Sequence, residues 1–475
     1  MTAPLPNSAA VVGPPGSRLK SQCLSYVEVL AQSVSVIAPS TVPAAVLGLI
    51  FASAGNGTWL SFLFGMSGLV LVSININHFA RRSASAGSLY QFIVKGLGGG
   101  AGIIGGWALL FGYMLTGMST LCGFAVTARG LLEAAGISVP SIFTFALATV
   151  ASIYIACRDV QLSAKAMLAL EGAAIAAVLA LGLVVWRHQG FSVDRAQLTL
   201  SGATPGGVLG GVVLVVFAFS GFESATALGE EAKDPLRSIP RSVVQSVIVS
   251  GLIFIFMAYV VILGFRDFDA DLSKAESPLL LLSSKLKLAW LGAFINFGIL
   301  ISFFSCTLAS ISATARIVYS MARHGVAPRA LGRVHRRNKT PYVAIAFAGI
   351  LTFVVSFAPS LFGVSEFDAQ GYFGTLCSFG FLSVYVLISL AAPIYLRKLG
   401  ELTAASVIVA FLGAGFMVVP FLGVIGVPGS ALFPPPEFPN NILVWIYLIY
   451  MLAGGAWLLT LRRYKPRMID EVFED

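Results

Sequence analysis

Two carboxylic acids lie inside long apolar segments of this 475-residue chain, where a charge would be costly to bury. Glu223 closes the motif FSGFE in a hydrophobic stretch near the middle of the chain, and Glu171 lies within the apolar run 164–186. Ionisable side chains at membrane depth usually face a partner or a water-filled path and take part in moving protons or solutes. Glu223 could instead be structural, accepting hydrogen bonds from backbone N–H groups freed where a helix breaks. Both residues are therefore candidates for proton coupling, and the structural role of Glu223 stays open.

The segments that must position these groups carry helix-breaking residues at their centres. Pro39 interrupts SVSVIAPSTVPAAVLGLIF, and Gly221 interrupts the segment that holds Glu223. A break inside a membrane helix leaves backbone amides and carbonyls without partners, which is tolerated only where that backbone lines a cavity or binds something. Interrupted helices in corresponding positions of two halves indicate a secondary transporter built from inverted repeats.

The composition predicts an integral membrane protein. Apolar residues make up 57% of the chain, charged residues only 11%, and the mean hydropathy is +0.88. Runs of about twenty apolar residues, the length needed to cross a bilayer, predict twelve transmembrane helices. These spans lie near 24–50, 57–79, 100–128, 139–157, 164–186, 206–229, 240–264, 288–320, 341–358, 371–396, 404–426 and 441–461.

The distribution of basic residues predicts the orientation. With both termini cytoplasmic, most of the 30 Lys and Arg residues fall in cytoplasmic loops, as the positive-inside rule requires. The same bias accounts for the net charge of +9 without nucleic-acid binding. We expect a multi-pass protein of the cell inner (plasma) membrane, with a disordered cytoplasmic tail over 1–20 and a cytoplasmic C-terminal tail over 463–475.

The sequence contains no motif that indicates an enzyme or an ATP-driven pump. The chain has no GxxxxGK[ST] motif for hydrolysing ATP, so a gradient must supply any pumping energy. GxGxxG at Gly100, Gly102 and Gly105 opens a membrane helix rather than following a strand, which favours close helix packing over dinucleotide binding. No cofactor and no metal site are expected. An intramembrane enzyme would need a paired nucleophile and base, yet all four histidines fall at helix ends or in loops: His78, His188, His324 and His335.

The eighth predicted span, with SFFSCTLASISAT, is rich in hydroxyl and small side chains. Such residues usually pack helices tightly, so a scaffold role is favoured for any single hydroxyl. A wall of the ion or substrate path is the alternative.

The stretch FAFSGFESATALGEEAKDPLRSIPRSV over 217–243 resembles the sixth-helix signature of the amino acid-polyamine-organocation (APC) transporters. NHFARRSASAGSLYQFIVKGLG over 77–98 and the stretch 315–345 extend the similarity over nearly the whole chain. The resemblance implies an all-α integral membrane protein with the five-plus-five inverted-repeat (LeuT-like) fold, in which helices one and six are unwound at mid-membrane. The core would span 21–400, with repeats of about 21–190 and 203–400, and 401–462 would form two peripheral helices.

The resemblance also implies a substrate-binding site at the two breaks. Amides at Ser40 and Thr41 would receive a substrate carboxylate, and carbonyls around Ile37, Ala218 and Phe219 its amine, in keeping with the dipoles of helix ends. The predicted substrate-binding set is Ile37, Ala38, Ser40, Thr41, Tyr113, Ala218, Phe219, Ser220, Gly221 and Phe222. Phe219 and Phe222 would border the site and Tyr113 would approach from the third helix, although ordinary packing explains these aromatics equally well.

Two positions depart from the family pattern. The first break reads IAPST where many members carry a glycine-rich GxG, and Ala174 stands where many carry a lysine on helix five. Glu171 or Glu223 would then take the proton, or the protein would exchange substrates without one.

The sequence therefore predicts a secondary active transporter of amino acids that works by alternating access, with proton symport as the first mechanism. An amino acid/amine antiporter or a polyamine or organic amine permease is the alternative, and a channel-like facilitator is disfavoured because no repeated selectivity loop is present. Expected partners are the small-molecule substrate, protons and the lipid bilayer. The protein would be a monomer or homodimer.

Overall fold

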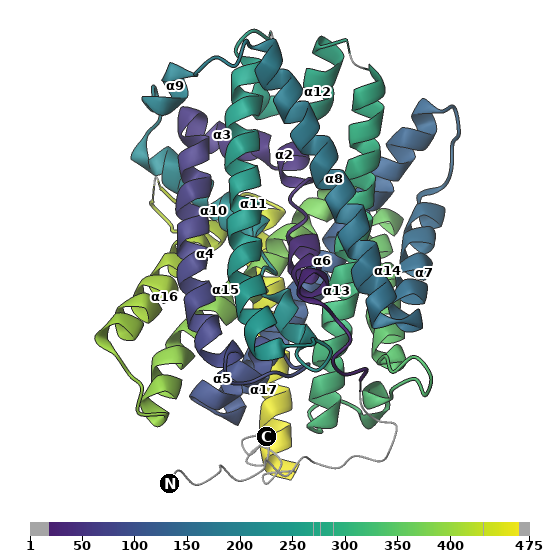
Figure 1. The fold of residues 1–475 in the computed structure, drawn as a ribbon, viewed down its shortest axis with the longest axis vertical. Coiled ribbons are helices and arrows are strands. Elements are labelled where there is room, and N and C mark those ends of the chain that lie inside the picture. The colour runs from purple at the N-terminus through teal and green to yellow at the C-terminus, as the bar shows by residue number, and fades with distance from the viewer. Residues whose placement is uncertain (1–18, 269, 276, 288, 431, 465–475) are drawn as a thin grey trace.

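The computed structural model describes residues 19–268, 270–275, 277–287, 289–430 and 432–464, and helices dominate it (Figure 1). Within these ranges no β-strand forms, and a single parallel bridge joins Leu24 to Ala232. The all-α class predicted from the sequence is confirmed.

Ten helices in the described residues are long and apolar enough to cross a membrane. In Figure 1 most of them run roughly parallel, with α7 and α16 at opposite edges of the bundle. Their bounds are α4 (Thr58–Ala80), α6 (Gly99–Ala134), α7 (Ser141–Arg158), α8 (Val160–His188), α11 (Pro235–Phe265), α13 (Ala289–Arg323), α14 (Tyr342–Leu361), α15 (Glu366–Lys398), α16 (Ala404–Ile425) and α17 (Asn440–Tyr464).

The two segments with central breaks are divided into short helices. The first consists of α1 (Tyr26–Ile37), α2 (Val42–Ala45) and α3 (Leu47–Ala54), followed by η1 (Gly55–Gly57); the second consists of α10 (Pro205–Ala218) and η2 (Ser224–Leu228). Because α1 and α10 are too short to count as spans by length, the total of twelve crossings stays a prediction. The remaining elements are α5 (Leu89–Leu97), α9 (Arg195–Leu198), η3 (Leu272–Lys274), α12 (Pro278–Lys285) and η4 (Arg329–Gly332).

Both chain interruptions pass through the left-handed region of backbone space. Ala38 ends α1 with φ 49° and is followed by Pro39, which has no N–H to continue the helix. Gly221 lies beyond the end of α10 with φ 86°, and a Cβ there would come within 2.2 Å of Val36 Cγ1. Two features of position 221 therefore require glycine: the positive φ angle and the close contact with the end of α1.

The glycines at the start of α6 let α5 approach closely. A Cβ on Gly102 would lie 2.1 Å from Val94 Cγ2, and one on Gly105 would lie 2.6 Å from Ile93 Cδ1. The packing role predicted for this GxGxxG sequence is confirmed.

The predicted terminal tails lie mostly outside the described residues. Of the predicted tail 1–20, Leu19 is buried and the Lys20 ammonium contacts the Asp159 carboxylate at 2.9 Å. Of 463–475, only the last two residues of α17, Arg463 and Tyr464, are described.

Candidate functional site

A cavity of about 90 Å³ lies where the two helix breaks face each other. Five of the predicted substrate-binding residues line it: Ile37, Ala38, Thr41, Ala218 and Ser220. Scaffold helices α6, α13 and α15 close the remaining sides, so the cavity lies between the broken segments and an unbroken frame.

Sequence reasoning missed most of the remaining wall. Its polar and thiol groups are Thr116, Ser119, Thr120, Gln370, Cys306 and Cys377. Its other members are Val36, Val42, Ala45, Val46, Phe217, Phe303 and Gly374. The small and hydroxyl-bearing side chains of the eighth span were the one available signal, but a scaffold role was favoured for each of them and Cys306, the member that lines the cavity, was not singled out. None of the described residues that line the cavity carries a formal charge.

Glu223 lies beside this cavity, fully buried, and is held by two tyrosines. The Tyr113 hydroxyl of α6 donates to Oε1 at 2.8 Å, and the Tyr385 hydroxyl of α15 donates to Oε2 at 2.6 Å. Tyr385 also accepts a hydrogen bond from the Gly221 N–H at 3.0 Å. The carboxylate therefore secures the second break to the frame through tyrosine hydroxyls. Tyr113 had been expected to approach from the third helix, whereas nothing in the sequence singled out Tyr385.

The aromatic side chains of the second break point into packed regions. Phe219 packs edge-on against Phe254 with ring centroids 4.9 Å apart, and Phe222 packs against Tyr385 at 5.1 Å. Both rings are buried, and neither lines the cavity.

Glu171 secures the first break in a different way. It extends from α8 and accepts hydrogen bonds from Ser302 Oγ of α13 at 2.8 Å and from Ser40 Oγ at 3.3 Å. All three residues are buried. Ser40 therefore faces Glu171 rather than the cavity, while the Thr41 N–H donates to the Ala38 carbonyl at 3.0 Å.

Direct hydrogen bonds join the two broken segments to each other and to α13. Ser33 Oγ of α1 accepts from the Ala225 N–H at 2.9 Å. Ser305 Oγ donates to Ser35 Oγ at 3.1 Å, and Cys306 Sγ lies 3.1 Å from the Val36 carbonyl. In the eighth predicted span, Ser302 and Ser305 therefore bond neighbouring helices, while the Cys306 thiol borders the cavity.

Comparison with known proteins settles the family. The profile of the amino acid permease family matches residues 31–462, which is most of the chain. The chain belongs to the amino acid permease family. The expected kinship with APC transporters is therefore confirmed, as is the expectation of a transporter rather than an enzyme.

Several characterised permeases are similar at low identity. The branched-chain amino acid permease BcaP of Bacillus subtilis is 24% identical over 392 residues, which cover 78% of this chain and 80% of the relative. The low-affinity putrescine importer PlaP of Escherichia coli K12 is 26% identical over 394 residues, covering 79% and 83%. Cationic amino acid transporter 4 of mouse is 23% identical over 355 residues, covering 70% and 54%.

The start of α1 is joined to the residues after η2 and to α13 by hydrogen bonds and a buried ion pair. The amides of Cys23 and Leu24 donate to the Glu231 carbonyl at 2.8 and 3.0 Å. The Glu231 carboxylate pairs with the Arg316 guanidinium of α13 at 2.6 and 3.0 Å, and both residues are buried. These contacts join the start of α1, the residues after η2 and α13 into one connected layer.

A second network ties the loops at the opposite end of the permease. Asp194 Oδ2 accepts from Arg266 Nε at 3.0 Å, and the Arg266 guanidinium also bonds Asn56, which follows α3. Partial burial by itself would raise the pKa of Asp194, but hydrogen bonds from Gln197 and Arg266 outweigh it and lower that pKa below its ordinary value. The carboxylate is thus a fixed anion that fastens the loop after α8 to the end of α11.

Proposed function

We propose that this permease is a secondary active transporter that carries amino acids across the cytoplasmic membrane by alternating access. Proton-coupled symport is the first mechanism and exchange of amino acids or amines is the second. The observation that carries the proposal is the cavity enclosed by two broken helices, because such breaks at membrane depth are the usual binding sites of secondary transporters. The family match and the transported substrates in the relatives' names support it.

In the proposed topology each broken segment makes one crossing, which together with ten long helices gives twelve. Residues 21–190 and 203–400 would be the inverted repeats, 401–462 the peripheral pair, and both termini would be cytoplasmic in the inner membrane of a monomer or homodimer. The connected layer around Glu231 and Arg316 would then lie on the cytoplasmic side, which is where the positive-inside rule puts the basic residues that follow α13.

A neutral amino acid with an apolar side chain fits the cavity best. Its walls combine hydroxyl, amide and thiol groups with Val, Ile, Ala and Phe side chains, and hold no carboxylate or ammonium. A diamine would bring two positive charges into a space without a negative side chain, and burying such charges unpaired is costly. A zwitterion balances its two charges within one molecule, and the backbone carbonyls of Ile37 and Ala218, which line the cavity, can receive its amine. Ser40 faces Glu171 and the Thr41 N–H already donates to the Ala38 carbonyl, so a carboxylate would bind at these two amides only after the first break rearranges.

Glu171 is the residue that we propose for proton coupling, and Glu223 is an anchor. A serine hydroxyl can rotate to donate to a carboxylate or to accept from a carboxylic acid, so Glu171 keeps partners in both protonation states. Tyr385 already accepts from the Gly221 N–H while it donates to Glu223. Protonating Glu223 would add a donor between two tyrosine hydroxyls that already donate to it, so this site accommodates a proton less readily than the serine pair around Glu171.

Counterflow into proteoliposomes tests the proposed transport. Vesicles preloaded with unlabelled leucine should transiently accumulate labelled leucine but not labelled putrescine. Thr116→Leu, which fills the cavity, should abolish the accumulation. Thr127→Leu is the matched control, because Thr127 is also on α6 and also bonds the carbonyl four residues earlier but does not line the cavity.

Each arm has an outcome that contradicts the proposal. Counterflow of putrescine without leucine would overturn the assignment to neutral amino acids. If both threonine variants lost counterflow equally, or if neither lost it, the cavity would not be the binding site.

A further inference from the structure

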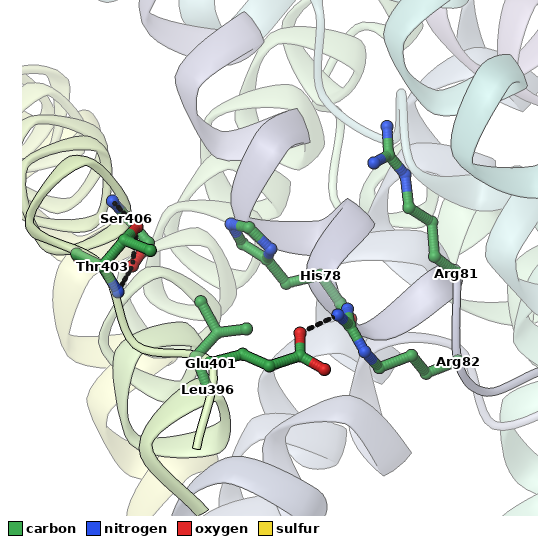
Figure 2. A pocket seen from close by; sticks show the side chains of 7 residues that line it. All are labelled: His78, Arg81, Arg82, Leu396, Glu401, Thr403 and Ser406. Atoms are coloured by element: carbon green, nitrogen blue, oxygen red, sulfur yellow. Dashed lines mark hydrogen bonds and ion pairs between the residues drawn. The ribbon is translucent and has the colours of Figure 1, made fainter. Parts of the chain in front are cut away.

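A second, larger cleft of about 430 Å³ lies away from the transport cavity, where α4 ends, α15 ends and α16 begins. Figure 2 shows its seven lining residues: His78, Arg81, Arg82, Leu396, Glu401, Thr403 and Ser406. Three of these side chains are basic or imidazole groups from the last turn of α4 and the residues just after it. The cleft is thus lined by α4 on one side and by the connection between α15 and α16 on the other.

The basic groups of this cleft are only partly satisfied within the described chain. Arg82 pairs with Glu401, which neutralises its charge (Figure 2), and it also donates to the His78 carbonyl at 2.8 Å. Arg81 is exposed, and no described residue forms an ion pair or side-chain hydrogen bond with its guanidinium. Nε2 of His78 is buried and has no hydrogen-bond partner among the described residues. Arg81 therefore offers one full positive charge to an anionic ligand, and the buried His78 Nε2 beside it lacks a partner among the described residues.

The surroundings of the cleft suit a lipid better than a free ion. It opens where three apolar helices end, at the depth at which phospholipid headgroups lie. Leu396 lines it, and Leu399 and Leu402 beside Glu401 are 44% and 42% exposed. The N-terminal turn of α16, capped by Thr403 and Ser406, adds its partial positive charge. Basic pockets between membrane helices on the cytoplasmic side are typical sites for anionic headgroups.

We propose that this cleft binds the phosphate group of an anionic phospholipid, with the exposed Arg81 guanidinium contacting the phosphate and the exposed leucines contacting acyl chain. Glu401 limits the affinity, because it neutralises Arg82 and places a negative charge beside the phosphate. The site is separate from the transport cavity and does not depend on which solute is carried.

Native mass spectrometry of the full-length protein with added phosphatidylglycerol or phosphatidylcholine tests this proposal. We expect preferential binding of phosphatidylglycerol. Arg81→Gln should weaken it about 5-fold, the usual contribution of one basic residue near anionic lipid. Glu401→Gln should strengthen it by a similar factor, because it frees Arg82. Arg237→Gln is the matched control, since Arg237 is an exposed arginine on the same predicted side with only a 4.0 Å contact to Asp234.

Arg81→Gln should weaken lipid binding and Glu401→Gln should strengthen it. Misfolding cannot explain both results, because a damaged protein would not bind lipid more tightly. Unchanged binding in both Arg81→Gln and Glu401→Gln would overturn the proposal. So would equal binding of phosphatidylcholine. Displacement of phosphatidylglycerol by inorganic phosphate at equal concentration would assign the site to a free anion and overturn the lipid assignment.

Discussion

The two helix breaks are each fastened by a buried carboxylate, but the carboxylates come from opposite sides of the contact. At the first break the acid belongs to an unbroken helix, since Glu171 of α8 accepts a hydrogen bond from Ser40 of the broken segment. At the second break the acid belongs to the broken segment, since Glu223 is held by Tyr113 and Tyr385 of the frame.

This difference separates a contact that can change from one that is fixed. Two serine hydroxyls surround Glu171, one of them at 3.3 Å, and both can reverse their hydrogen bonds when the acid takes a proton. The second break is held by short bonds to two tyrosines that are themselves fully buried. We therefore expect the first break to respond to protonation and the second to fail when any of its parts is changed.

The largest expected effect is that of Gly221→Ala. The substitution forces a side chain into a left-handed conformation and against Val36, so we expect a loss of about 2 to 4 kcal/mol in stability and no transport. Thermal unfolding in nanodiscs and counterflow would measure both. Gly172→Ala is the control, because a Cβ at Gly172 of α8 meets no atom within 4 Å. Equal tolerance of the two substitutions would contradict the packing at the second break.

The next largest effect is the loss of stability when either tyrosine that holds Glu223 is replaced by phenylalanine. Tyr385→Phe leaves the Gly221 N–H and one Glu223 oxygen without partners, whereas Tyr113→Phe leaves only the other oxygen. We expect Tyr385→Phe to cost about 2 to 4 kcal/mol and Tyr113→Phe about half as much, from the penalty for unsatisfied buried groups. The unfolding temperatures of the two variants would show the order. The reverse order would mean that Tyr385 does not hold the break.

Asp194, which lies outside the predicted spans, shows how much an ordinary ion pair contributes to the stability of this protein. Because the pKa of Asp194 is lowered from 3.8 in the folded protein, its contribution is present at higher pH and is lost as the pH falls through the lowered value. Asp194→Asn should cost about 1 to 2 kcal/mol at pH 7, and the difference from the unsubstituted protein should shrink below about pH 4. Thermal unfolding measured from pH 3 to 8 would show this. Asp234→Asn, at an exposed and loosely paired site, should show neither effect.

The smallest effect is expected at the first break. Ala38 already occupies the left-handed region with φ 49°, a strain that glycine would relieve, so Ala38→Gly should change stability by no more than about 1 kcal/mol and leave transport intact. Unfolding temperature and counterflow are the readouts. A loss as large as that from Gly221→Ala would show that the two breaks have the same requirements.

The positions of the breaks could be predicted from the sequence because proline and glycine act locally. Pro39 and Gly221 mark them whatever the surrounding helices do, and the run of apolar spans follows from composition in the same way. Glu223 was singled out in the sequence because a carboxylate in a membrane segment is conspicuous.

The frame around the breaks could not be predicted. α6, α13 and α15 are apolar on nearly every face, so periodicity does not tell which side of each helix meets the cavity. Tyr385 and Gln370 are therefore unremarkable in the sequence and become informative only when α15 is packed against α6. The nine-residue α5 was missed because it is too short for the rule used to find spans.

The most direct test of the account is uptake driven by a pH gradient, compared with counterflow at equal pH, in proteoliposomes of Glu171→Gln and Glu223→Gln. The account predicts that Glu171→Gln keeps counterflow but loses gradient-driven accumulation, because the carrier still alternates without binding a proton. It predicts that Glu223→Gln loses both activities, because the second break is no longer held. Gradient-driven accumulation that persists in Glu171→Gln, or counterflow that persists in Glu223→Gln, would contradict the assignment of the two carboxylates.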